Sequence, residues 1–94
     1  MIAKVSVGTS ATLIRAAEER KGYIVTNQGA AVVYLSLGGE ATVTLPAGAS
    51  PGMPLNPGER VIASQEDRRS VAVNQAIYGI VESGTCAVSI EVIP

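Results

Sequence analysis

The amino-acid sequence predicts an all-β protein, a small antiparallel β-sandwich or barrel of jelly-roll-like type with about eight or nine short strands. Val and Ile together number 20 against five Leu, and β-branched side chains fit strands better than helices. Ten Gly and five Pro divide the 94 residues into mostly strand-sized intervals. At this length we expect a single β-sandwich domain over residues 1–94, with one core built from small side chains.

The N-terminal part of the chain is predicted to contain three strands. Residues 2–7 alternate weakly between apolar and polar side chains, residues 12–14 are extended, and residues 23–27 form a strand that ends in a turn. Residues 16–21 hold the main group of helix formers, and Gly22 could end a helical turn there. We favour a polar loop, because this segment is too short to nucleate a helix by itself.

The next two segments predict a β-hairpin. Residues 31–37 run into Gly38 and Gly39, after which residues 41–45 alternate with a period of two. A Gly-Gly pair supplies the positive φ that a two-residue turn needs, without steric cost. The strand over residues 31–37 is apolar on both faces, with Val33, Leu35 and Leu37 on one side and Val32 and Tyr34 on the other. Such a strand is central in a sandwich, or another subunit covers its second face.

The C-terminal half begins with a long irregular loop. Residues 46–58 carry four Pro and three Gly, with a brief extended piece near Met53 and Leu55. Pro57 and Gly58 fit the central positions of a type II turn. The remaining elements are a strand over 60–64, a charged loop over 65–69, strands over 71–73, 77–81 and 86–93, and a hairpin turn over 82–85 that joins the last two.

Charge and hydropathy exclude two classes of partner. Seven Lys and Arg against eight Asp and Glu give a net charge of −1, and there is no basic patch or group of aromatic residues for binding nucleic acid. No apolar run approaches the ~20 residues of a membrane span, and the N-terminus lacks the pattern of a signal peptide. We expect a soluble chain, made in the cytoplasm and complete from Met1, with neither nucleic acid nor a membrane as a partner.

The residue types also argue against catalysis. Histidine is absent, which removes the commonest general base and metal ligand. The carboxylates at Glu18, Glu19, Glu66 and Asp67 fall in charged loops, where solvated surface is the simpler interpretation. The single cysteine, Cys86, alternates with apolar residues and is predicted to be a buried hydrophobe instead of a reactive thiol. We therefore predict no enzyme activity, no cofactor and no metal site.

The excess of apolar strand surface favours assembly. A small β domain with a tyrosine-bearing outer face gains stability when that face is buried against copies of itself or against a larger partner. Val32, Tyr34 and Tyr78 are the candidate subunit contacts. The alternative is a monomer in which the second sheet covers Val32 and Tyr34 internally.

Several strand-and-turn segments, in this order, resemble small virion-associated β proteins and fibre modules of tailed bacteriophages. The segments are residues 5–14, 20–27, 33–39, 52–59 and 76–92. In such proteins this pattern marks a scaffold and carries no catalytic residue. The resemblance implies a structural virion protein, made in the host cytoplasm.

The resemblance further implies a decoration or cement protein that binds the outside of the head and stabilises it by bridging capsid subunits. Its partners would be further copies of itself, with a trimer favoured, and the major capsid protein or another virion protein. Arg68 and Arg69 are the candidate contacts to an acidic capsid surface. The alternative is a tail or fibre-associated module that recognises a host surface glycan.

Overall fold

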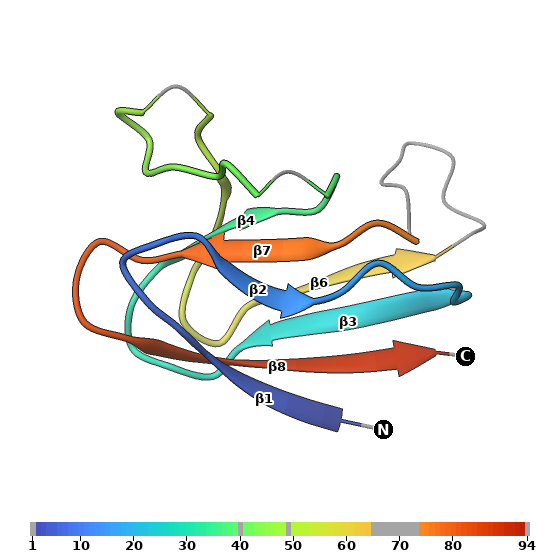
Figure 1. Cartoon of the computed structure of the whole chain (residues 1–94). Coiled ribbons are helices and arrows are strands. Elements are labelled where there is room, and N and C mark those ends of the chain that lie inside the picture. The colour runs from blue at the N-terminus through green and yellow to red at the C-terminus, as the bar shows by residue number, and fades with distance from the viewer. Residues whose placement is uncertain (1, 40, 49, 65–73, 94) are drawn as a thin grey trace.

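The computed structural model shows eight β-strands in two four-stranded antiparallel sheets that pack face to face (Figure 1). The structure describes residues 2–39, 41–48, 50–64 and 74–93. The strands in these ranges are β1 (Ile2–Val7), β2 (Thr12–Arg15), β3 (Gly22–Asn27), β4 (Val33–Ser36), β5 (Met53–Leu55), β6 (Arg60–Ser64), β7 (Ile77–Ile80) and β8 (Cys86–Ile93). The predicted β-sandwich is therefore confirmed, and neither sheet closes into a barrel.

The strand order shows that the chain passes repeatedly from one sheet to the other. Sheet A has the order β1-β8-β3-β6, and sheet B has the order β2-β7-β4-β5. In sheet A, β8 lies between β1 and β3, so the C-terminal strand pairs with the N-terminal one. Both termini lie at the same end of the sandwich (Figure 1). Most pairing partners are far apart in the sequence, and local patterns therefore say little about which strands meet.

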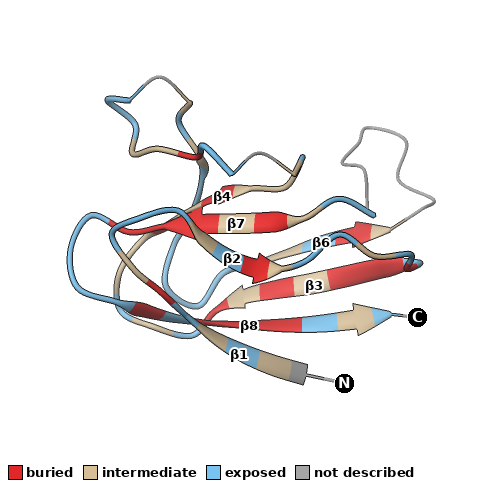
Figure 2. Ribbon diagram, in the orientation of Figure 1, coloured by how far each residue is buried: buried red, intermediate tan, exposed pale blue. Residues whose placement is uncertain are grey.

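The core forms where the inner faces of the two sheets meet. Alternate residues of β3 and β8 point inward from sheet A, and β4 and β7 supply the facing side chains of sheet B. Figure 2 shows the buried positions along these four strands. The largest buried side chains are Tyr23, Ile77 and Ile90. Half of the other buried apolar residues in the described part of the chain are Val, and only one, Ala63, is Ala.

Several predicted elements are confirmed. The strands at β3, β6 and β8 have nearly the predicted bounds, and residues 16–21 form a loop without a helical turn. The turn before β6 is the predicted one: Glu59 N donates to Asn56 O at 2.9 Å. Gly58 has φ of 83°, the positive value that its place in a type II turn requires.

The predicted hairpin over residues 31–37 and 41–45 is wrong. Strand β4 pairs with β5 and β7, and the segment 41–45 contributes only one isolated bridge, from Thr44 to Pro51, among the described residues. The described residues between β4 and β5 instead form a loop, in which Val43 is buried and Thr44 N donates to Ser50 O at 2.8 Å. Pro54 lies in β5, at the edge of sheet B, where its missing N–H breaks no ladder.

The predicted hairpin turn over 82–85 is also wrong. Strand β7 belongs to sheet B and β8 to sheet A, so this segment carries the chain across the sandwich. The chain leaves sheet B at Val81, which is fully buried and whose N–H donates to Gly8 O at 3.0 Å. The predicted loop over 65–69 and strand over 71–73 lie outside the described residues.

Candidate functional site

The outer face of sheet B carries a group of apolar side chains, which we call the B face. It consists of Leu13, Tyr34, Pro54, Tyr78 and Ile80. Tyr34 on β4 lies opposite Ile80 on β7 and Pro54 on β5. Tyr78 lies opposite Leu13 on β2. The residues on either side of Tyr34 belong to the core, as does Ile77 beside Tyr78. Because successive residues of a strand point to opposite sides of the sheet, the side chains of the B face point away from sheet A.

The B face is apolar and partly open to solvent. Leu13 is 46% exposed, and the two tyrosines are half-buried. Ile80 is only 8% exposed, although it lies outside the core cluster. None of the five side chains carries a charge. The face therefore offers apolar contact area with two tyrosine hydroxyls at its surface.

The three predicted subunit contacts lie on or beside this face. Val32 and Tyr34 line one hollow of about 230 Å³ together with Ala31, Glu82 and Ser83. Tyr78 lies on the neighbouring strand, opposite Ser36, two residues along β4 from Tyr34. Sheet A packs against the other side of β4, where Val33 and Leu35 are buried. Tyr34 thus stands on the face of β4 that sheet A does not cover.

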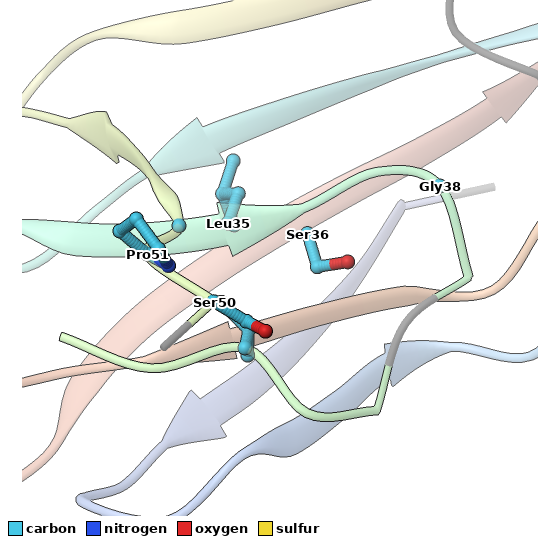
Figure 3. A pocket seen from close by; sticks show the side chains of 7 residues that line it. Leu35, Ser36, Gly38, Ser50 and Pro51 are labelled. Carbon is cyan, nitrogen blue, oxygen red and sulfur yellow. The ribbon is translucent and has the colours of Figure 1, made fainter. Parts of the chain in front are cut away.

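A second hollow lies beside the end of β4 and the returning arm of the loop between β4 and β5. It measures about 390 Å³ and is lined by Leu35, Ser36, Gly38, Val43, Ser50, Pro51 and Gly52. Ser36 ends β4, while Ser50 and Pro51 come from the returning arm of the loop (Figure 3). Among the described residues, the lining offers two hydroxyls, from Ser36 and Ser50, together with backbone groups.

A third surface hollow, which we call the A groove, lies on the outer face of sheet A. It measures about 220 Å³ and is lined by Lys4, Ile24, Thr26, Gln28, Arg60, Ser89 and Glu91. These residues come from β1, β3, β6 and β8 and from the residue after β3. The groove combines two cations, one carboxylate, two hydroxyls and an amide over the half-buried Ile24.

A buried arginine closes the end of the sandwich near the loop over residues 16–21. The Arg20 side chain is fully buried, and its Nη1 donates to Ala16 O at 3.1 Å and to Glu18 Oε1 at 3.1 Å. Its Cζ lies 5.3 Å from the centroid of the Tyr23 ring. Arg15 Nε donates to Glu18 Oε1 at 2.6 Å, and this hydrogen bond, with the Arg15 and Arg20 charges, lowers the pKa of Glu18. These contacts connect the loop over residues 16–21 to the core. Within the cluster, Arg15 and Arg20 are both paired with Glu18.

Cys86 is buried, as predicted. It is 3% exposed, and its Sγ lies 3.1 Å from Asn27 Oδ1. Asn27 is itself buried, and its Nδ2 donates to Ala31 O and to Leu55 O. The thiol is therefore part of the packing between β3 and β8.

Within residues 2–39, 41–48, 50–64 and 74–93, no three His, Cys, Asp or Glu residues gather closely enough to hold a metal ion. The same part of the chain contains no helix that is both long and apolar enough to cross a membrane. The predicted capsid contacts Arg68 and Arg69 lie outside the described residues. Comparison of the chain with known protein families, curated proteins and solved structures gave no match.

Proposed function

We propose that the protein is a structural virion subunit, a decoration protein that binds the outside of a bacteriophage head in several copies. The B face carries this proposal. It places Tyr34 and Tyr78 among five uncharged side chains of an outer surface, with Leu13 at its border and Glu82 beside Tyr34. A surface of this chemistry gains free energy when a second protein removes it from water, at about 25 cal/mol for each Å² of apolar area.

The size of the molecule supports contact through a whole face. Its two longest extents are 33 and 26 Å. A standard protein interface buries about 800 Å² on each partner, which is comparable to one broad face of such a molecule. Burial of the B face against another copy would leave the outer face of sheet A available to a further partner.

Assembly explains how such a subunit would stabilise a shell. A ligand that binds only the assembled shell stabilises it by RT ln(1 + [L]/Kd) for each site. Joined copies bind with a raised effective concentration, so weak individual contacts add up. The assignment to a virion rests on the resemblance of the strand-and-turn segments to virion-associated proteins of tailed bacteriophages. Arg68 and Arg69 remain the predicted contacts of the protein with an acidic capsid surface.

The subunit contact is tested by charge substitution on the B face. Tyr34→Asp should convert the oligomer to a monomer, because a carboxylate buried in an apolar contact loses its hydration without gaining a partner. Leu13→Asp changes a side chain that is 46% exposed and should have the same effect without loss of core packing. Molar mass is measured by light scattering.

Ser6→Asp is the matched control for these variants. Ser6 is exposed on β1, on the outer face of sheet A. The molar mass of Ser6→Asp should therefore equal that of the unmodified protein. Unchanged mass in both Tyr34→Asp and Leu13→Asp would reject the B face as the subunit contact.

The virion role is tested by sedimentation with emptied capsids. The purified protein should pellet with the capsids, and replacement of both Arg68 and Arg69 by Ala should reduce the bound fraction. A protein that stays in the supernatant and is monomeric at high concentration would overturn the proposed function.

A further inference from the structure

Four polar side chains stand in one row across the outer face of sheet A. Arg60 on β6 pairs with Thr26 on β3, Thr26 pairs with Ser89 on β8, and Ser89 pairs with Lys4 on β1. These are the directly opposed positions of neighbouring strands, so the side chains project from the same face. The row therefore has a cation at each end and two hydroxyls between them.

The row forms the floor and ends of the A groove. Its ends are three strand spacings apart, about 14 Å between the backbones of Lys4 and Arg60. Both cations are exposed and have long, flexible side chains, so each can lean over the hydroxyls. In the adjacent row Ile24 lies opposite Glu91, which adds an apolar surface and one carboxylate.

The polar groups of the groove are largely uncommitted within the part of the chain that the structure describes. No ion pair joins Lys4 or Arg60 to Glu91 there. Gln28 Nε2 donates to Ser89 Oγ at 3.2 Å, which leaves the hydroxyl proton of Ser89 to donate elsewhere. Ser89 is only 8% exposed, so its hydroxyl is held at the base of the groove.

The backbone around the groove restricts the class of ligand. Strands β3 and β8 are each paired on both sides, so an extended peptide cannot add to them as a further strand. Over these two central strands, recognition must come from the side chains that stand up from the sheet. Hydroxyls, an amide and a carboxylate are suited to a ligand with many hydroxyl groups, and Ile24 can contact the C–H face of a ring. Two cations against one carboxylate favour a ligand that is also an anion.

We propose that the A groove binds an acidic saccharide, a chain of sugar rings that carry carboxylates. Lys4 and Arg60 bind carboxylates at the two ends of the groove. Thr26, Ser89 and Gln28 bind ring hydroxyls, and Glu91 accepts a hydrogen bond from one of them. The site lies on the opposite side of the sandwich from the B face, so it does not depend on the proposed function.

The test is an NMR titration of the ¹⁵N-labelled protein with a trimer of galacturonic acid. The backbone amides of Lys4, Thr26, Ser89 and Arg60 should shift in a saturable manner. A neutral trimer of galactose, which has the same ring hydroxyls without the carboxylates, should bind more weakly. A triglutamate peptide, which has carboxylates without ring hydroxyls, should also bind more weakly.

Variants assign the binding to the groove. Lys4→Gln and Arg60→Gln should each raise the dissociation constant about tenfold, the loss of one hydrogen bond to a charged group. Thr26→Val keeps the shape of the side chain and should weaken the acidic and the neutral trimer alike. Lys21→Gln removes an exposed cation outside the groove and should leave the affinity unchanged.

Three results would overturn the proposal. These are the absence of saturable shifts at the groove, equal affinity for the neutral trimer, and equal affinity for the peptide. All these measurements concern sheet A. None of these results therefore changes the outcome of the light-scattering test of the B face or of the sedimentation test with capsids.

Discussion

Tyr23 is the largest fully buried side chain of the sandwich, and its environment determines how the fold responds to alkaline pH. Its hydroxyl makes no hydrogen bond with any residue that the structure describes. Burial raises the pKa of this hydroxyl above its ordinary value of 10.0, and the nearby Arg20 charge opposes that change. A phenol buried in this way favours its neutral form.

This difference in pKa predicts a loss of stability at high pH. The unfolded chain releases the Tyr23 proton at about pH 10, below the pKa of the folded state. The contribution of this pKa difference to the free energy of unfolding is therefore complete below pH 10. It is lost as the pH rises toward the folded-state pKa of Tyr23. The Tm of the unmodified protein should fall more steeply above pH 10 than that of Tyr23→Phe, as measured by circular dichroism.

Tyr78→Phe is the control, since it removes a tyrosine hydroxyl but leaves Tyr23 in place, and it should keep the steep alkaline decline. At neutral pH, Tyr23→Phe should be at least as stable as the unmodified protein, because a buried hydroxyl without a partner costs about 1–3 kcal/mol. A lower Tm for Tyr23→Phe at neutral pH would show that the hydroxyl has a partner.

Single residues differ in how far the sequence predicts their burial. Cys86 alternates with apolar neighbours, and this pattern predicted its burial. Arg20 lies next to Lys21 in a charged segment, yet Arg20 is buried and Lys21 is exposed. The difference comes from acceptors at Ala16 and Gln75, which only the tertiary fold brings together.

At the scale of elements, the wide loop between β4 and β5 replaces the hairpin that Gly38 and Gly39 suggest. Gly39 has φ of 85°, the positive value expected of the Gly-Gly pair, although no hairpin forms there. The segment that follows forms no strand ladder in the described residues. Backbone hydrogen bonds join Thr44 to Ser50 and Gly52, and Val43 packs beside Gly52. Period-two alternation is thus insufficient for a strand when the neighbouring strand already has two partners.

Two glycines of this loop provide a test of how it docks. A Cβ at position 52 would lie 2.7 Å from Val43 Cγ2 and from the backbone carbon of Tyr34, so the loop must shift. Gly52→Ala should lower the free energy of unfolding by about 1–3 kcal/mol, the usual cost of overpacking. Gly38→Ala meets nothing within 4 Å and should have little effect.

Urea denaturation of both variants supplies the measurement. If residues 31–37 and 41–45 formed a tight hairpin with Gly38 in the turn, Gly38→Ala would be the more costly change, because Ala does not tolerate positive φ. A larger loss of stability in Gly38→Ala than in Gly52→Ala would contradict the docked loop.

At the scale of the whole molecule, the sandwich has two outer faces of different chemistry. The B face is apolar, whereas the A groove is charged and rich in hydroxyls. Composition and turn spacing predicted the fold class and the approximate number of strands. They did not predict the strand order, because β8 pairs with β1 and β3 through contacts between distant segments. The row from Arg60 to Lys4 depends on that register and was therefore invisible in the sequence.

The two faces should respond in opposite ways to ionic strength. The Debye length falls from about 10 Å at 0.1 M salt to about 3 Å at 1 M, so binding of the galacturonate trimer to Lys4 and Arg60 should weaken strongly. Association through the B face buries apolar groups and should persist or strengthen under the same conditions. The two quantities to compare are the dissociation constant from NMR and the molar mass from light scattering over one sodium chloride series. Dissociation of the oligomer at high salt would mean that charged groups, and not Tyr34 and Tyr78, hold the copies together.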